Sequence, residues 1–171
     1  MKLNVSLYIP VYNGESTIES VLKSVLKLSP APNEIIVIND GSSDDTEKIL
    51  EGYKNQIKII SNKSNMGLGY SRNIGISNSQ NENVASLDAD VEVAKEWLAD
   101  LHGIKNKYSS AISGGRLIEK YKDESVYDLW RHVYATQNSF GDENIFLLED
   151  FLIDNYKLRF YLHRSSTYHK Q

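Results

Sequence analysis

Short apolar runs bounded by polar or turn-forming residues recur along much of the chain. The strongest have the length and β-branched content of buried strands, and they cover residues 5–9, 34–40, 57–60 and 84–87. Between the first two, apolar residues recur over 18–26 at the 3.6-residue spacing of an amphipathic helix. Because strands and helices alternate at short spacing, the pattern predicts parallel pairing with right-handed crossovers, which is the arrangement of a doubly wound α/β sheet.

Start and stop signals predict the ends of these elements. The first strand should stop at Pro10, because proline cannot donate to a strand ladder. Residues 16–19 match a capping box for the first helix, and Asp44 with Glu47 forms a second capping pair for a short helix through Leu50. The later predicted elements are a weak helix over 70–77 that Gly75 interrupts, a helix around 97–104, a strand over 111–118 and a helix around 126–133.

One apolar run, residues 83–87, ends in two carboxylates, Asp88 and Asp90, separated by a single alanine. Ligands of open α/β sheets bind beyond the carboxyl ends of the strands, and in an extended chain residues i and i+2 point to the same face. Both carboxylates could therefore converge on Mg²⁺, which is typically held by one or two carboxylates together with substrate phosphates. The alternative is a solvated acidic turn that caps the next helix.

Three other features follow the earlier strands, at the same expected edge of the sheet. Tyr12 follows the first strand and could stack on a nucleobase or serve only in packing. Asp40 follows the second strand and could accept hydrogen bonds from a base or ribose, or act as a turn former. In the loop after the third strand, Gly67 and Gly69 could approach a ligand or adopt positive φ. Arg72 offers a planar fork that suits a diphosphate or a surface ion pair.

Composition and charge narrow the class of protein. The 171 residues are 40% hydrophobic and 25% charged, which fits one soluble, folded domain. The absence of cysteine excludes disulfides, thiolate zinc sites and cysteine nucleophiles. A formal net charge of −4 without a long basic run argues against nucleic-acid binding. Because no apolar stretch is long enough to span a bilayer and no signal peptide is evident, we expect a cytoplasmic protein that could still contact the membrane peripherally.

Four motifs together resemble those of the family 2 glycosyltransferases, which have the GT-A fold. They occur in the family's order and at its usual spacing within residues 1–118, at positions 9–13, 37–46, 65–75 and 87–90. The resemblance implies a single domain over residues 1–171, built on a Rossmann-like, mostly parallel sheet flanked by helices. It also implies transfer of a sugar from a nucleotide-activated donor, with inversion at the anomeric carbon.

The resemblance implies roles for particular residues of the nucleotide-sugar-binding half, residues 1–118. Pro10 and Gly67 belong to substrate-binding motifs, Tyr12 and Asp40 correspond to base-recognising residues, Arg72 to a donor-site residue near the nucleotide, and Asp88 to a ribose or sugar contact. Asp90 would be the ligand of the Mn²⁺ or Mg²⁺ ion that bridges the diphosphate. The two base-recognising positions favour a UDP-sugar as the donor.

Residues 119–171 would then form a shortened acceptor half. In the family, an aspartate of a Glu-Asp pair is the base that acts on the acceptor hydroxyl. The pair available here is Glu149-Asp150, with Asp150 as base and Glu149 as an acceptor contact. Tyr168-His169 resembles a Tyr-His in which the histidine can join the metal, although His169 could also be merely exposed. The acceptor would be a glycan or a lipid-linked molecule.

The acceptor half also departs from the family pattern. The stretch 115–149 is short, and the Glu-Asp pair is followed almost at once by residues 155–158. The chain is either a compact or degenerate member, or a sequence that lacks flexible acceptor loops. The main alternative function is a non-catalytic nucleotide-sugar-binding module. A sugar-phosphate nucleotidyltransferase is disfavoured because residues 10–14 do not resemble its Gly-Gly-x-Gly-x-Arg start, and a phosphoacceptor signalling domain would need an acid pair after the first strand.

Overall fold

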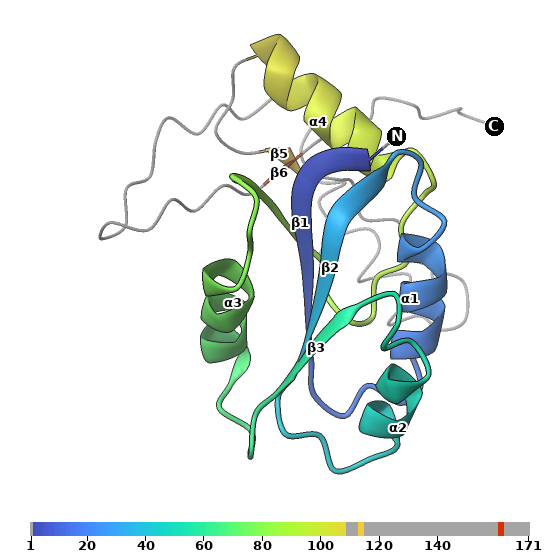
Figure 1. The fold of residues 1–171 in the computed structure, drawn as a ribbon, viewed down its shortest axis with the longest axis vertical. Coiled ribbons are helices and arrows are strands. Elements are labelled where there is room, and N and C mark those ends of the chain that lie inside the picture. The colour runs from blue at the N-terminus through green and yellow to red at the C-terminus, as the bar shows by residue number, and fades with distance from the viewer. Residues whose placement is uncertain (1, 109–112, 115–160, 163–171) are drawn as a thin grey trace, which may run out of the picture.

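The computed structural model of the protein describes residues 2–108, 113–114 and 161–162. A central sheet carries helices on both of its faces (Figure 1). In chain order, the elements are β1 (Lys2–Val11), α1 (Ile18–Val25), β2 (Ala31–Asn39), α2 (Thr46–Glu51), β3 (Lys58–Ser61), α3 (Leu68–Ser77), β4 (Asn83–Ser86), α4 (Trp97–Tyr108), β5 (Ser113–Gly114) and β6 (Tyr161–Leu162).

The main sheet has the strand order β3-β2-β1-β4, and every pairing in it is parallel. Leu7 in the centre of β1 pairs with Ile35 of β2 on one side and with Ala85 of β4 on the other. A second, two-stranded parallel sheet is formed by β5 and β6. The parallel α/β sheet predicted from the apolar pattern is therefore confirmed.

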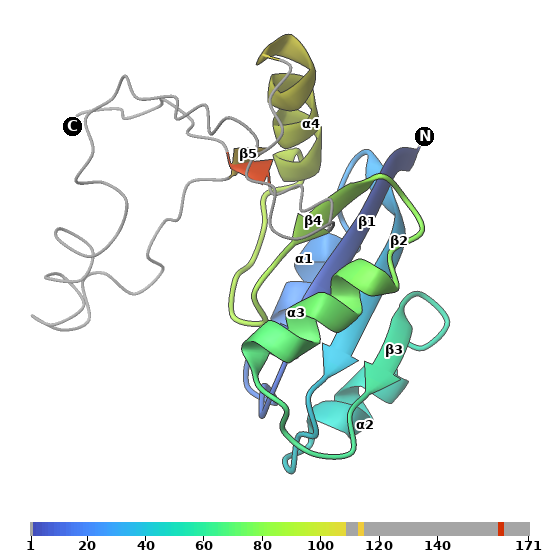
Figure 2. The same ribbon diagram turned by 90° about the vertical axis from the view of Figure 1, so that its left-hand side faces the viewer.

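Both faces of the sheet's centre are buried, as is usual for parallel strands. On one face, Leu7 and Ile9 of β1 belong to the core cluster that α1 completes. On the other face, Tyr8 packs with Ile36 and Ile38 of β2 against the apolar side of α3. Figure 2 shows α3 lying across this second face, opposite α1. The sheet is thus the middle layer of three.

Gly75 allows α3 to approach the sheet closely. A Cβ atom at this position would lie 2.5 Å from Cδ2 of Tyr8, which is well inside van der Waals contact. The sequence suggested that this glycine interrupts a weak helix, but α3 is continuous from Leu68 to Ser77. Its role is therefore to make room for the Tyr8 ring.

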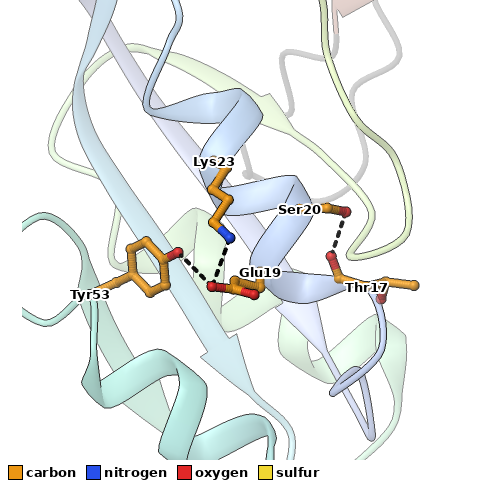
Figure 3. Close-up of polar contacts among 5 residues, drawn as sticks. All are labelled: Thr17, Glu19, Ser20, Lys23 and Tyr53. Carbon is orange, nitrogen blue, oxygen red and sulfur yellow. Dashed lines mark hydrogen bonds and ion pairs between the residues drawn. The ribbon is translucent and has the colours of Figure 1, made fainter.

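The helix α1 is held mainly by its apolar side, because Ile18, Val21, Leu22 and Val25 are all buried. Its outer side carries a small polar cluster (Figure 3). There, the Lys23 ammonium lies 2.8 Å from a Glu19 carboxylate oxygen, and the Tyr53 hydroxyl that follows α2 donates to the same carboxylate at 3.5 Å. Exposed pairs of this kind contribute little to stability.

The prediction that the first strand stops at Pro10 is wrong. The strand continues to Val11, and Pro10 pairs in register with Ile38 of β2. The Leu87 amide donates to the Tyr8 carbonyl at 3.1 Å, so the alternate residues of β1, including Pro10, turn their backbone polar groups toward β4. Since β4 ends at Ser86, no amide is needed at Pro10 on that side.

The predicted capping box of the first helix is also not formed. Thr17 is the N-cap residue, but its side chain makes no cap hydrogen bond. Instead, the Gly14 carbonyl accepts from the amides of Thr17 and Ile18 at 3.0 and 2.9 Å. At α2 the N-cap is Asp45, whereas Asp44 accepts from the Thr46 amide at 3.0 Å. These local bonds, together with the hydrogen bonds between loops described below, take the place of the predicted capping pairs.

The remaining elements follow the predicted order, with ends displaced by a few residues. The strand predicted over 111–118 is described only at β5, and the helix predicted around 126–133 lies outside the described residues. Among the helices of the described ranges, none has the length and apolar character needed to cross a membrane.

Candidate functional site

The strand order reverses at β1, which creates a topological switch point. The chain adds β2 and β3 on one side of β1, and then crosses through α3 on the other face to place β4 on the opposite side (Figures 1 and 2). Ligands of open α/β sheets bind at such a point, beyond the carboxyl ends of the strands. Tyr12 follows β1 and the acidic segment 88–90 follows β4, so both come from the two strands that flank the switch.

Tyr12 combines a fixed backbone with an available ring. The residues before it, Pro10 and Val11, are buried in the sheet, and the Val11 carbonyl accepts from the Asp40 amide at 2.8 Å. Tyr12 itself is 49% exposed. A ligand can therefore reach the Tyr12 side chain, whereas Pro10 is buried as part of β1.

Asp40 follows β2, but its side chain is turned into the protein and only 3% of the residue is exposed. One carboxylate oxygen accepts from the Asn62 side-chain amide at 2.6 Å and from the Met66 amide at 3.0 Å, and the other accepts from the Gly67 amide at 2.8 Å. Burial raises the pKa of Asp40, but these hydrogen bonds and the Ser71 hydroxyl outweigh it and hold the pKa below its ordinary value. Asp40 therefore holds the loop before α3 as an ionised acceptor.

Gly41 brings the loops after β2 and β3 into direct backbone contact. It adopts φ +69°, and a Cβ atom there would overlap the Ser64 carbonyl carbon. Gly67, at φ +93°, stands at the N-cap position of α3. The predicted positive φ is thus confirmed at Gly67, whereas Gly69 lies within α3. Together with the bonds to Asp40, these contacts join the two loops into one rigid unit.

Arg72 and Asp88 meet at the switch point. The Nη2 atom of Arg72, on α3, lies 3.0 Å from Oδ1 of Asp88, and the two side chains are 38% and 54% exposed. The Nε atom of Arg72 is buried and has no hydrogen-bond partner among the described residues. Asp88 therefore holds the guanidinium at the site, while the Nε–H group of Arg72 makes no hydrogen bond among the described residues.

The acidic segment is a turn rather than an extended strand. The Val91 amide donates to the Asp88 carbonyl at 3.2 Å, and the strand β4 has already ended at Ser86. The expectation that Asp88 and Asp90 share a face by strand alternation is therefore wrong, because the chain bends between them. Both residues are exposed at the site edge.

The donor atoms of this turn suit a hard divalent cation. Within the described ranges, no group of three or more His, Asp or Glu side chains is placed to hold a metal ion. Mg²⁺ can nevertheless be held by one or two carboxylates when the phosphates of a substrate supply further ligands, and this turn exposes two. The carboxylates thus fit a cation that binds together with a diphosphate.

Several other predicted residues cannot be placed. Glu149, Asp150 and His169 all lie outside the described residues. The roles assigned to them by resemblance stay predictions.

Sequence reasoning missed residues that support the site through their hydrogen bonds or their backbone conformation. Asn62 and Ser71 hydrogen-bond to Asp40, and Asn13 adopts φ +49°, which is the one positive φ of a non-glycine residue in the described ranges. The turn composition of residues 11–14 is a signal for the positive φ of Asn13, because asparagine tolerates the left-handed conformation. Nothing in the local pattern around Asn62 or Ser71 reveals their contact with Asp40, since that contact is made by the tertiary fold.

The exposed large apolar side chains of the described residues gather near the same edge. They are Tyr12, Met66, Leu68 and Tyr70, each between 45% and 53% exposed. Three of the four lie in the loop before α3 or in its first turn. Residues 66–70 are therefore named the apolar loop below.

Curated relatives match part of the chain. It is 38% identical over 104 residues to a cholesterol galactosyltransferase of Borreliella burgdorferi, covering 59% of this chain and 29% of the relative. It is also 38% identical over 87 residues to UDP-Glc:alpha-D-GlcNAc-diphosphoundecaprenol beta-1,3-glucosyltransferase of Escherichia coli, covering 50% and 34%. The chain spans about a third of the length of these curated relatives.

Solved structures share the fold. Residues 1–349 of TarS from S. aureus, in complex with UDP-GlcNAc, superpose with a TM-score of 0.59 and 28% identity, over 72% of this chain and 39% of that one. A mannosyltransferase from Pyrobaculum calidifontis, in complex with GDP-Man and Mn²⁺, gives a TM-score of 0.61 at 18% identity, over 77% and 39%. The fold is therefore of the GT-A type.

The sequence motifs, the sheet topology and these similarities agree. The family model described as Glycosyl transferase family 2 matches residues 6–170, which is nearly the whole chain. The protein belongs to glycosyl transferase family 2.

Proposed function

We propose that the protein is an inverting, metal-dependent glycosyltransferase that moves a sugar from a nucleotide-sugar donor to a glycan or lipid-linked acceptor. The observation that carries the proposal is that an aromatic face, a guanidinium and an acidic turn gather at one switch point, as Tyr12, Arg72 and residues 88–91. These groups match the base, the diphosphate and the cation of a nucleotide sugar. The relatives that use UDP-Glc or bind UDP-GlcNAc support a UDP-sugar as the donor.

The donor would lie across the switch point with its base on the β1 side. Tyr12 offers an exposed ring for stacking, and Asp40 fixes the neighbouring amide of Gly67. We assign residues 1–118 to donor binding and residues 119–171 to the acceptor.

The ion pair between Arg72 and Asp88 would open when the donor binds. A partly exposed pair of this kind is weak, whereas a diphosphate offers several charged oxygens to the same fork. Transfer of the guanidinium from Asp88 to the diphosphate would leave the Asp88 carboxylate free to contact the ribose or the sugar. A single residue contact thus couples diphosphate binding to the release of a sugar-binding group.

The metal would be held by Asp90 and by His169, which lies outside the described residues. When bound, Mn²⁺ or Mg²⁺ would offset the negative charge that develops on the departing nucleoside diphosphate. The exposure of Asp90 leaves room for phosphate oxygens beside it.

The transfer itself is a direct displacement. The acceptor hydroxyl loses its proton to Asp150, and its oxygen bonds to the anomeric carbon as the bond from that carbon to the diphosphate oxygen breaks. The attack comes from the face opposite the leaving group, which inverts the configuration. Glu149, next to the base, would contact the acceptor.

The apolar loop supports a lipid-linked acceptor. Met66 and Leu68 are each more than half exposed and lie close to the Gly67 amide that Asp40 holds. Apolar side chains beside a donor site suit an acceptor whose lipid part stays in the bilayer, with the protein bound peripherally at the cytoplasmic face. The cholesterol and diphosphoundecaprenol acceptors named for the two relatives have this character.

The experiment is a thermal-shift and calorimetric screen of nucleotide sugars with and without Mn²⁺, followed by product analysis with the donor that binds. Ligands that bind the native state raise its melting temperature. Metal-dependent binding of a UDP-sugar with transfer or donor hydrolysis is the expected result. Binding without either reaction would favour the alternative, a nucleotide-sugar-binding module, and no binding of any donor would refute both.

A further inference from the structure

The loops that follow β1 and β2 are joined by reciprocal hydrogen bonds between residues 13–15 and 42–46. The Asn13 amide donates to the Ser42 hydroxyl at 2.9 Å, and the Asn13 side-chain oxygen accepts from the Ser43 amide at 2.9 Å. Each loop therefore both donates to and accepts from the other. Two loops bonded in this way cannot shift independently.

The same pattern repeats two residues further along both loops. The Glu15 amide donates to Asp44 at 3.0 Å, and the Glu15 carboxylate accepts from the Asp45 amide at 3.0 Å. Between these pairs, the amide of Gly14 donates to the buried hydroxyl of Thr46 at 2.8 Å. We name this set of contacts the loop clasp.

The loop clasp holds Asn13 in an unusual backbone conformation. Its φ of +49° lies in the left-handed region, which asparagine tolerates better than most residues but which still costs free energy. The bonds at the amide and the side chain of Asn13 keep the residue there. An outlier held by bonds from two directions indicates that the position of the adjacent residue matters.

That adjacent residue is Tyr12. Its backbone is tied on one side through the Val11 carbonyl, which accepts from Asp40, and on the other side through Asn13. The Tyr12 ring remains 49% exposed. A large exposed aromatic on a doubly tied backbone is a preorganised stacking surface, because little further ordering is needed when a flat ligand binds.

We infer that Asn13 is a positioning residue that sets Tyr12 for the nucleobase and thereby controls base affinity and base choice. The inference rests on the proposed function. It assigns Asn13 no contact with the diphosphate, because Arg72 and the acidic turn lie on the β4 side of the switch point, whereas the loop clasp lies on the β2 side. Base recognition and diphosphate recognition should therefore respond separately to substitution.

The test compares Asn13→Ala, Asn13→Asp and Asn33→Ala with the full-length wild type. Calorimetry gives Kd for UDP, GDP and inorganic pyrophosphate, each with Mn²⁺. Asp at position 13 keeps an acceptor for the Ser43 amide and tolerates positive φ. Asn33, whose side chain bonds to Asn4 and Asn81 at the opposite end of the sheet, is the matched control.

The expected result for Asn13→Ala is a loss of UDP affinity of roughly tenfold or more, with a reduced preference for UDP over GDP. Pyrophosphate affinity should stay within about twofold, since its contacts are elsewhere. Asn13→Asp should retain most of the UDP affinity, and Asn33→Ala should equal the wild type. Glu15→Ala removes a more exposed contact of the clasp and provides a milder variant if Asn13→Ala does not fold.

Three results would overturn the inference. They are unchanged UDP affinity in Asn13→Ala, an equal loss of UDP and pyrophosphate affinity, and a loss in Asn13→Asp as large as in Asn13→Ala. Where Glu15→Ala replaces Asn13→Ala, a selective loss of UDP affinity supports the inference, and an unchanged affinity overturns it. A wild-type protein that binds no nucleoside diphosphate would instead show, before any variant is made, that the proposed function itself fails.

Discussion

Asp40→Asn tests whether a buried carboxylate holds the loop before α3. The carboxylate accepts hydrogen bonds from the Asn62 side chain and from the amides of Met66 and Gly67. The amide of asparagine has one oxygen acceptor, so its NH₂ group must face at least one of these donors. The Gly67 amide also donates to the Asn65 side-chain oxygen at 2.9 Å, which limits the loss of stability.

The size of the effect follows from the kind of bond lost. Hydrogen bonds to a charged group contribute about 1.5–3 kcal/mol each, against about 1 kcal/mol for neutral pairs. Replacing charged bonds by neutral ones, with one donor turned against another, should lower the free energy of unfolding by about 2 kcal/mol. For a domain of this size the melting temperature should fall by roughly 4–8 °C.

The pH dependence of the difference identifies its cause. The pKa of Asp40 in the folded protein lies below its ordinary value of 3.8, because the hydrogen bonds outweigh burial. Its stabilising contribution is therefore complete above the unfolded-state pKa and is lost as the pH falls through the folded-state pKa. The difference between wild type and variant should be constant near neutral pH and shrink below about pH 4.

The assay is thermal unfolding of both proteins by circular dichroism across this pH range. Asp100→Asn, which makes the same charge change at an exposed position of α4, is the control and should leave the melting temperature nearly unchanged. Equal melting temperatures for wild type and Asp40→Asn at pH 7 would refute the reasoning. A difference that grows on acidification would refute it as well.

Three further substitutions test other parts of the molecule. Gly75→Ala should destabilise the fold by about 1–3 kcal/mol, because a methyl group would overlap the Tyr8 ring, and chemical denaturation measures this; the exposed Gly69→Ala, which has nothing within 4 Å, should not destabilise it. Asp90→Ala should abolish Mn²⁺-dependent UDP binding in calorimetry, and unchanged affinity would contradict its role as metal ligand. Asp150→Asn should leave UDP binding intact while transfer to the acceptor is lost, and retained turnover would point to another base.

The fold was predictable because each buried strand and each amphipathic helix has a characteristic hydrophobic pattern over consecutive residues. Successive residues of a strand face opposite sides of the sheet. In β1, for instance, Leu7 and Ile9 face one side and Tyr8 faces the other. The ends of elements were less predictable. Pro10 continues the first strand only because β4 stops before reaching it, and that depends on a segment about 75 residues away.

The location of the candidate site at one edge of the sheet was predictable, although the roles of its residues stay predictions. Placing Tyr12, Arg72 and Asp88 at one edge needs only the order of the strands, and the contact between Arg72 and Asp88 agrees with it. The orientation of Asp40 could not be read from its position after a strand. Whether a carboxylate faces a ligand or a neighbouring loop depends on donors such as Asn62 and Met66, which the tertiary fold brings to it.

The pairing of β1 with β4 has a consequence for the order of folding. Val5 pairs with Asn83, so the two sides of the switch point lie at the ends of a long loop, whereas β1, α1 and β2 meet through short connections. Long-range pairings of this kind form late, because chain entropy opposes them. During folding, the surface that carries Tyr12 should thus form before the acidic turn packs beside it. A ligand that bridges the two should slow unfolding of the finished protein more than it speeds folding.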